Sequence, residues 1–275
     1  MSSYLKMAIF ASISFLLVSV GLILSNKYIK KQSTKNLVYA IFCILTVLIH
    51  YSIVPYSYFA NIEYEIEDNL YLPVYPCNII MWLSLIAAFV RKDTLFFKRI
   101  SEFLFYCGTV CAFVGIIFNF NFYNTPDLKD FGIFKGLVSH VTLIFSTLYL
   151  RVMGYVSIST RSSMLSALVG CAIFVFCGIL TDVVKTIQGK ELVNGLLLHI
   201  DKTRPFYSFY FGVFLGFFVL FVGTTIYETL KYPAEQRWYY KYMNKKNEQN
   251  WLFIFFWIIL AFVNGLTHLV VEFNY

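Results

Sequence analysis

The chain has 275 residues, of which 59% are apolar, 20% are aromatic and only 13% are charged. This composition excludes a water-soluble domain, because too few polar residues are left to cover its surface, and it indicates a protein dissolved in lipid. The formal net charge of +7 comes without a motif of basic and aromatic residues. We therefore expect attraction to anionic lipid headgroups and no binding of nucleic acid.

Eight apolar runs are each long enough to cross a bilayer, which takes roughly 20 residues, and in hydrocarbon each must be helical. In chain order they are Met7–Leu24, Leu37–Tyr56, Leu72–Val90, Ile100–Phe120, Phe131–Leu150, Ser163–Val184, Phe206–Tyr227 and Trp251–Val271. The first is interpreted as a retained span and not a secretory signal, because its lysines follow it. The sequence thus predicts an all-α, polytopic transmembrane helical bundle of about eight spans, forming a single transmembrane domain over residues 1–275 of a multi-pass cell-membrane protein.

Basic residues between the runs predict the orientation, because cytoplasmic loops carry an excess of lysine and arginine. Loops on one side hold fifteen basic residues: Lys27, Lys30, Lys31, Lys35, Arg91, Lys92, Lys98, Arg99, Arg151, Arg161, Lys231, Arg237, Lys241, Lys245 and Lys246. The other side holds seven: Lys6, Lys129, Lys135, Lys185, Lys190, Lys202 and Arg204. We therefore expect both termini outside, with the acidic stretch 63–68 in an outer loop.

Polar side chains inside a span are costly in hydrocarbon and therefore invite a functional explanation. Along the chain these are His50 in the second run, Cys77 in the third, His140 in the fifth, Asp182 in the sixth and His268 in the eighth. At about 1.5 Å per residue, Cys77 and His140 lie about 8 Å and about 14 Å below the outer ends of their spans. Their similar depth favours a shared, outward-facing cavity.

Cys77 follows Pro73 and Pro76, and proline is best tolerated in the first turn of a helix. The positive end of the helix dipole favours a thiolate there, although a nearby base is also needed to form it. His140 is the best-placed base. A thiolate beside an imidazole is the minimum apparatus for attacking an ester and holding the acyl group as a thioester, which favours acyl transfer.

The remaining cysteines also fall inside the predicted spans and are interpreted as free thiols that pack as small apolar groups. Cys107 and Cys111 share a helix face at i, i+4 spacing, but no histidine pair matches them. We therefore expect neither a metal site nor a cofactor.

The stretch 72–77, with the sequence LPVYPC, resembles the LP-x-x-x-C signature of YwaF-like integral membrane proteins. The Ser139-His140 pair resembles the Ser-His of the same family, and the resemblance runs from about the second span through the seventh. Two departures are visible. Tyr75 stands where histidine is common, and an Asn-Tyr pair expected after the sixth span is not evident, so that Asp182 or Asn194 is the candidate in its place.

The eukaryotic relatives of this family, the transmembrane protein 164 group, are regarded as phospholipid acyltransferases with a cysteine nucleophile. The resemblance implies that Cys77 is the nucleophile and His140 the base. Further residues are predicted to bind substrate: His50, Tyr75, Asn78, Ser139 and Asp182. One of His50, Asn78 and Asp182 is also expected to orient the imidazole of His140.

The first hypothesis is an acyltransferase that takes a fatty acyl group from a membrane phospholipid and passes it to a lysophospholipid or to a lipoprotein amine. A phospholipid is the expected donor because an outward site has no access to cytoplasmic acyl-coenzyme A. The alternative is a small-solute transporter or membrane binding protein without catalysis, with His50, Asp182 and His268 along a pathway. The sequence lacks the internal repeat common among transporters, and a structural assembly factor is a third interpretation.

Overall fold

The computed structural model describes residues 3–61, 70–117, 128–191, 196, 198 and 209–243. Every regular element within these residues is helical, which confirms the all-α fold for this part of the chain. The chain divides into two compact units, Met1–Ser157 and Ile158–Tyr275, and each is described here by itself. A single transmembrane domain over the whole chain stays a prediction.

Five helical stretches of the described residues are long and apolar enough to cross a membrane, as the sequence predicts for a membrane protein. They are Leu5–Tyr28, Gln32–Tyr51, Leu95–Ile117, Phe131–Val152 and Thr160–Ile187, while Pro76–Phe89 is apolar but shorter. The eighth predicted span, Trp251–Val271, lies outside the described residues, as does the acidic stretch 63–68. The total of eight spans and the outward termini stay predictions.

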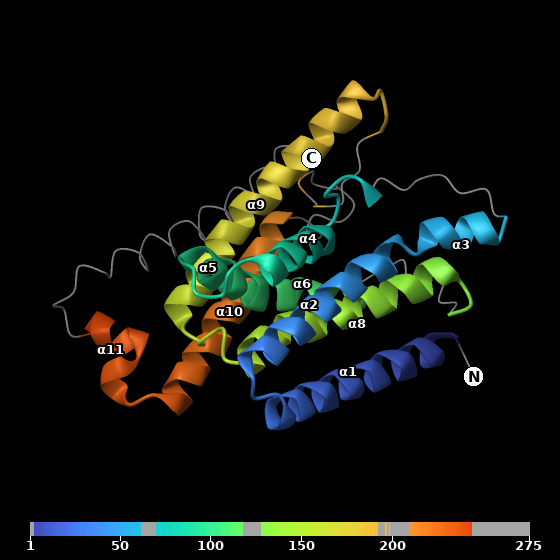
Figure 1. Ribbon diagram of the computed structural model, residues 1–275. Helices are drawn as coiled ribbons and strands as arrows, with labels where there is room; N and C mark the ends of the chain where they lie inside the picture. Colours follow the sequence, from blue (N-terminus) through green and yellow to red (C-terminus); the bar gives the residue numbers. More distant parts are fainter. Residues whose placement is uncertain are drawn as a thin grey trace. The chain divides into compact units, whose positions relative to one another are not determined.

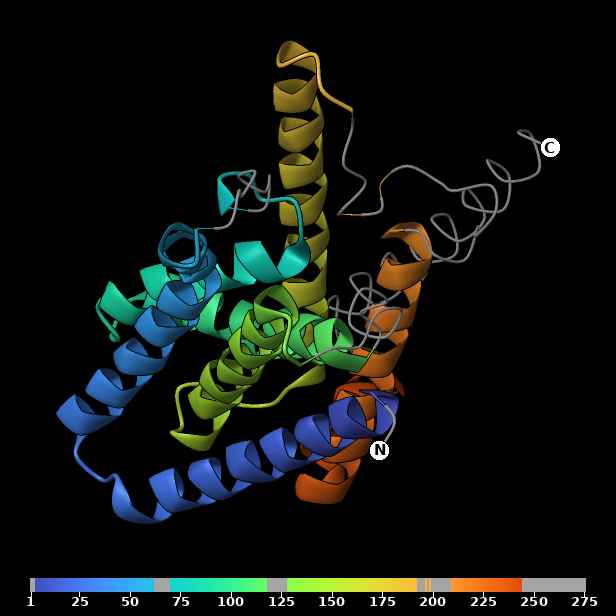
Figure 2. The ribbon, with the colours of Figure 1, turned by 90° about the vertical axis from the view of Figure 1, so that its right-hand side faces the viewer.

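The first unit contains the helices that position the candidate site. In chain order they are α1 (Ser3–Tyr28), α2 (Gln32–Tyr51), α3 (Ile53–Phe59), α4 (Pro76–Phe89), α5 (Leu95–Phe103), the π-helical turn η2 (Leu104–Gly108), α6 (Thr109–Ile117) and α8 (Phe131–Val152). Helix α8 is central, because it packs against α1, α2 and α6 and also touches α4 (Figure 1). Helices α1 and α2 are joined through residues 29–31 and diverge from this junction as the two arms of a V (Figure 2).

Aromatic rings and hydroxyl groups join α2 to α8. The rings of Phe42 and Phe145 lie with their centroids 3.9 Å apart. The Thr46 hydroxyl donates to Thr142 Oγ1 at 2.9 Å, so each helix supplies the other with a polar partner in an otherwise apolar contact. Hydrogen bonds between hydroxyls stabilise helix pairs in membranes because no water is available to replace them.

Local sequence signals fix both ends of α8. The Asp130 carboxylate caps the first turn and accepts hydrogen bonds from Gly132 N and Ile133 N at 2.7 and 3.2 Å. The C-terminal end is closed by Gly154, whose φ of 85° lies in the left-handed region that glycine adopts without strain. The predicted start at Phe131 agrees with the structure, and the helix ends two residues beyond the predicted Leu150.

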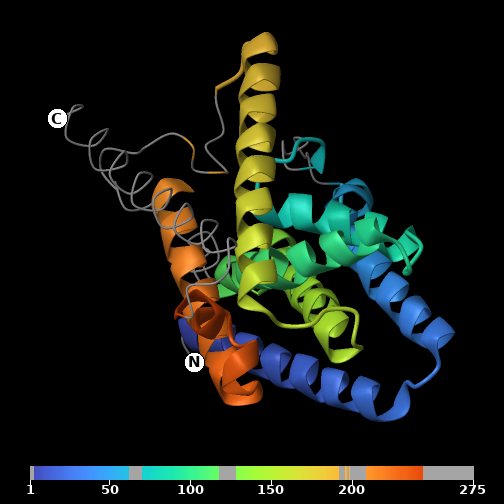
Figure 3. The same ribbon diagram turned by 90° about the vertical axis from the view of Figure 1, so that its left-hand side faces the viewer.

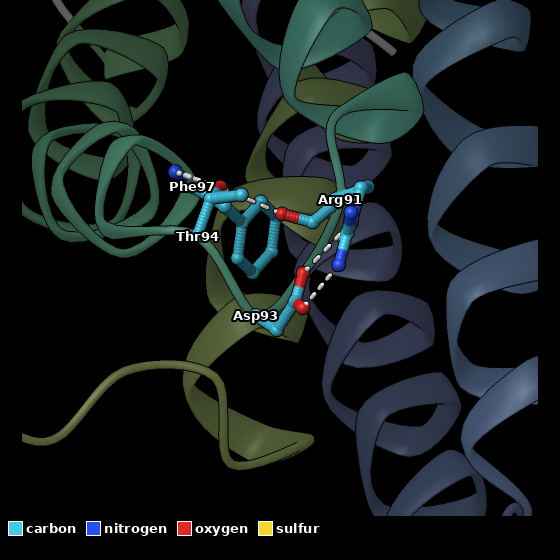
Figure 4. A network of polar contacts seen from close by, with 4 residues as sticks. All are labelled: Arg91, Asp93, Thr94 and Phe97. Carbon is cyan, nitrogen blue, oxygen red and sulfur yellow. Dashed lines mark hydrogen bonds and ion pairs between the residues drawn. The ribbon is translucent and has the colours of Figure 1, made fainter.

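The turn between α4 and α5 is stabilised by a small polar network (Figure 4). The Thr94 hydroxyl accepts a hydrogen bond from Phe97 N at 3.1 Å and donates to the Arg91 carbonyl at 2.8 Å. Arg91 Nη2 pairs with Asp93 Oδ2 at 2.7 Å. This capped turn starts α5 at Leu95, five residues before the predicted span, because the charged residues 98–99 belong to the helix and not to the loop.

Proline explains two further boundaries that differ from the predicted runs. The second run is broken at Ser52 into α2 and α3, because Pro55 cannot donate a backbone hydrogen bond to the preceding turn. The third run starts as a helix only at Pro76. Residues before it are extended or in turns, because the residue before a proline is pushed out of the helical region.

The second unit contains α9 (Thr160–Ile187), α10 (Phe209–Lys231), the 3-10 turn η3 (Ala234–Gln236) and α11 (Trp238–Met243). Helices α9 and α10 pack against each other (Figure 3). An apolar cluster of Met164, Ala167 and Phe217 joins them. The Ser163 and Thr224 hydroxyls lie 3.2 Å apart, which places the N-terminal end of α9 beside the C-terminal part of α10. The two helices are therefore antiparallel neighbours.

Candidate active site

Cys77 is the second residue of α4, directly after Pro76 in the first helical position. The Tyr75 carbonyl accepts hydrogen bonds from Asn78 N and Ile79 N at 3.0 and 3.4 Å, and this closes the first turn. The half-buried thiol therefore lies at the N-terminal end of a helix, as the sequence predicts. The partial positive charge at this end stabilises negative charge on the sulfur.

His140 lies in the middle of α8, where its side chain points back towards the preceding turn. Its Nδ1 atom lies 2.7 Å from the Gly136 carbonyl oxygen, one helical turn earlier. A carbonyl oxygen only accepts hydrogen bonds, so Nδ1 must carry the proton in this contact. In the neutral imidazole Nε2 then holds a lone pair and can act as a base.

The structure brings the two predicted catalytic residues together. His140 Nε2 lies 3.2 Å from Cys77 Sγ, within reach of a hydrogen bond from a thiol. The Cys111 carbonyl oxygen on α6 lies 3.6 Å from the same sulfur and is a second, more distant acceptor. The shorter contact to an unprotonated Nε2 favours transfer of the thiol proton to His140.

A second polar pair involves the residue that follows Cys77. Asn78, the residue after Cys77, is buried, and its Nδ2 atom lies 3.3 Å from His50 Nε2 on α2. The His50 ring packs edge to face against Tyr51, with centroids 5.2 Å apart. The pair thus joins the C-terminal end of α2 to the first turn of α4, next to the candidate nucleophile.

The other predicted site residues have different places. Ser139 donates its hydroxyl to the Gly136 carbonyl at 2.8 Å, so in this structure its hydrogen bond stays within α8. The Tyr75 side chain is exposed. Asp182 lies half-buried on α9 in the second unit, while Asn194 and His268 lie outside the described residues. The substrate-binding roles of these residues stay predictions.

Two backbone carbonyls, those of Gly136 and Cys111, face the reacting side chains and are not predicted from the sequence. We expect from the sequence that a side chain orients His140, whereas in the structure a main-chain oxygen holds Nδ1. Such a partner leaves almost no signal in the sequence, because every residue of a helix carries a carbonyl. The one usable signal is the i−4 spacing, at which a helical side chain folds back onto its own preceding turn.

This arrangement contains the parts that covalent acyl transfer needs. One side chain is a nucleophile once it is deprotonated, and the other can remove and return that proton. Cys43, Cys107, Cys111, Cys171 and Cys177 are free thiols too. Cys77 is distinguished from them by its helix terminus and its imidazole partner.

Comparison with protein families matches residues 1–197 to the model of the TMEM164 family. The matched residues include both Cys77 and His140, all the described helices of the first unit, and α9. No curated protein and no solved structure matches the chain.

Proposed function

The chain belongs to the TMEM164 family, and on that premise we propose that it is a membrane-embedded acyltransferase of the cell membrane that works through a thioester on Cys77. The donor is a phospholipid and the acceptor is a lysophospholipid or a lipoprotein amine. One observation carries the proposal: Cys77 Sγ lies 3.2 Å from His140 Nε2, while Nδ1 of the same ring is held by a carbonyl.

In the first half of the reaction the thiol proton moves to His140 Nε2, and the sulfur attacks the ester carbonyl carbon of the donor. A carbon–sulfur bond forms and the carbon–oxygen bond of the ester breaks. The proton on Nε2 passes to the departing oxygen, so that a lysophospholipid leaves and the acyl group stays on Cys77.

In the second half His140 acts again as a base. Its Nε2 takes a proton from the hydroxyl or amine of the acceptor, which attacks the thioester carbonyl. The carbon–sulfur bond breaks and the proton returns to the sulfur, which restores the thiol. No oxidant, reductant or metal ion enters either half.

The imidazole is able to serve both halves because its orientation does not depend on a titrating partner. In a Ser-His-Asp triad a carboxylate holds the base in the correct tautomer. Here the Gly136 carbonyl does so at 2.7 Å, and it keeps the same hydrogen-bonding character at any pH. Asp182 is therefore not required for this function of the ring.

A lipid-exchange assay tests the proposal. The full chain, purified and reconstituted in vesicles, is given phosphatidylcholine with deuterated acyl chains and unlabelled lysophosphatidylethanolamine. Lipid mass spectrometry is expected to detect deuterated acyl groups on the ethanolamine lipid. A parallel reaction with a lipopeptide that carries a free N-terminal amine distinguishes the two acceptor classes.

Three variants are compared with the wild type in this assay. Cys77→Ala abolishes transfer, and His140→Ala slows it by roughly 10²-fold to 10⁴-fold, the usual contribution of a positioned base. Cys111→Ala is the matched control, because it removes a different thiol and keeps the backbone carbonyl that lies 3.6 Å from the Cys77 sulfur. Transfer by Cys77→Ala at the wild-type rate would exclude the mechanism and favour the transporter or binding interpretation.

A further inference from the structure

Gly115 on α6 faces the Cys77–His140 contact with no side chain of its own. A Cβ atom built on this residue would lie 2.3 Å from both Cδ2 and Nε2 of the His140 ring. It would also lie 3.3 Å from Cys77 Sγ. The hydrogen atom of glycine therefore leaves the space in which the edge of the imidazole meets the sulfur.

A methyl group at Gly115 would clash with the His140 ring, which can move. Ordinary contacts of a Cβ begin near 3.4 Å, so a methyl group at Gly115 would displace the ring by about 1 Å. An imidazole can rotate about its side-chain bonds at modest cost, whereas its hydrogen bond to Sγ depends on distance and direction. The helix pair would still pack, but the proton transfer would lose its geometry.

Gly108, seven residues earlier on the same helical stretch, offers an instructive contrast. A Cβ there would lie 2.9 Å from Ile80 Cγ2 and 3.0 Å from Thr147 Cγ2. Both neighbours are β-branched and therefore stiff in a helix, so this clash would strain the packing of helices. No atom of Cys77 or His140 is among the nearest neighbours at Gly108.

We propose that Gly115 is a positioning residue: by lacking a side chain it sets the approach of His140 Nε2 to Cys77 Sγ. This role rests on the proposed acyl transfer for its purpose, but the coupling between thiol and imidazole is measurable without it. Gly115 touches neither the donor nor the acceptor in this account and acts only through the ring of His140.

Two readouts test the proposal on Gly115→Ala. The first is the rate at which iodoacetamide alkylates Cys77, followed by peptide mass spectrometry over a range of pH. We expect alkylation near neutral pH to fall at least about tenfold, because the imidazole no longer takes the proton. The second is lipid exchange, which we expect to fall about 10²-fold, the cost of misplacing a reacting group by about 1 Å.

Gly108→Ala is the matched control, because it adds the same methyl group to the same helical stretch. It is expected to lower the melting temperature of the protein and to leave the Cys77 alkylation profile unchanged. A packing role for Gly115 would give the same pattern in both variants. A specific positioning role gives loss of thiol coupling in Gly115→Ala alone.

A double variant keeps the test decisive even where Gly115→Ala is unstable. His140→Ala removes the ring that the new methyl group would meet most closely and leaves only the slighter contact at 3.3 Å from Cys77 Sγ. Adding Gly115→Ala to it should therefore lower the alkylation rate far less than Gly115→Ala does when the ring is present. An equally large drop in the alkylation rate would overturn the proposal, as would wild-type alkylation in the single variant. If Cys77 of the wild type is alkylated readily near neutral pH but the protein shows no lipid exchange, the proposed function fails. The alkylation rates of the variants then still decide whether Gly115 positions His140.

Discussion

Glu228 on α10 accepts two backbone hydrogen bonds at the starts of two other helices, and its removal is expected to destabilise the second unit strongly. The residue is buried, with 4% of its surface exposed. Its Oε1 atom accepts from Thr160 N at 2.6 Å, and its Oε2 atom accepts from Trp238 N at 3.0 Å. Both donors lie in the first turn of a helix, where backbone N–H groups have no partner within the helix.

The magnitude follows from these two bonds. A hydrogen bond to a charged group contributes about 1.5–3 kcal/mol, and a buried donor left without a partner carries the whole cost of its desolvation. We therefore expect Glu228→Ala to lower the free energy of unfolding by about 3–5 kcal/mol. Glu228→Gln keeps one acceptor oxygen but turns an amide N–H₂ towards the other donor, so we expect about half that loss.

The assay is thermal unfolding of the purified chain, followed by the exposure of Cys171 and Cys177 to a thiol-reactive dye, since both thiols lie on α9. Glu235→Ala is the matched control, because this glutamate is exposed in η3 and its loss should cost under about 0.5 kcal/mol. Equal stability of Glu228→Ala and Glu235→Ala would refute the capping argument.

Three further predictions concern the first unit. Ser101→Ala is expected to raise the free energy of unfolding by about 1 kcal/mol in chemical denaturation. The buried Ser101 hydroxyl has no hydrogen-bond partner among the described residues, so its removal also removes the cost of burying it. A lower free energy of unfolding would contradict this. The hydrogen bond from Arg91 lowers the pKa of Asp93. The free energy of unfolding of the wild type should therefore exceed that of Asp93→Asn by a constant amount above about pH 5, and this difference should shrink as the pH falls towards about 2. A difference that grows in acid would contradict the prediction. His50→Ala and Asn78→Ala should each slow lipid exchange by a similar factor, because the two side chains act as one hydrogen-bonded pair. The double variant should then be no slower than either single variant. If the two losses add up in the double variant, the side chains act independently.

Local physical signals in the sequence predict where the two residues of the candidate site lie along their helices. Pro76 fixes a helix start just before Cys77, and Asp130 fixes the start of α8, so the position of His140 along its span follows from the rise of a helix. The similar depth of the two residues in the membrane then predicts a contact between their side chains. Which helices are neighbours could not be predicted in this way, because apolar runs of similar composition pack in many orders.

The features that the sequence could not predict are those without a side-chain signature. The carbonyl of Gly136 orients His140, and the missing side chain of Gly115 admits its ring, yet neither residue differs from any other glycine in a membrane helix. Glycine is common at close helix contacts in membranes, so its presence indicates packing and not chemistry. Gly115 differs from Gly223 only in its surroundings in the fold, because a Cβ built on Gly223 would meet no atom within 4 Å.

The covalent intermediate is the most direct test of the account. The purified chain is incubated with phospholipid that carries a deuterated acyl group, quenched in acid and analysed by peptide mass spectrometry, with neutral hydroxylamine used to cleave thioesters. We predict a deuterated acyl group on the peptide that contains Cys77, removed by hydroxylamine and strongly reduced in His140→Ala. An acyl group on another cysteine, or efficient lipid exchange by Cys77→Ala, would contradict it.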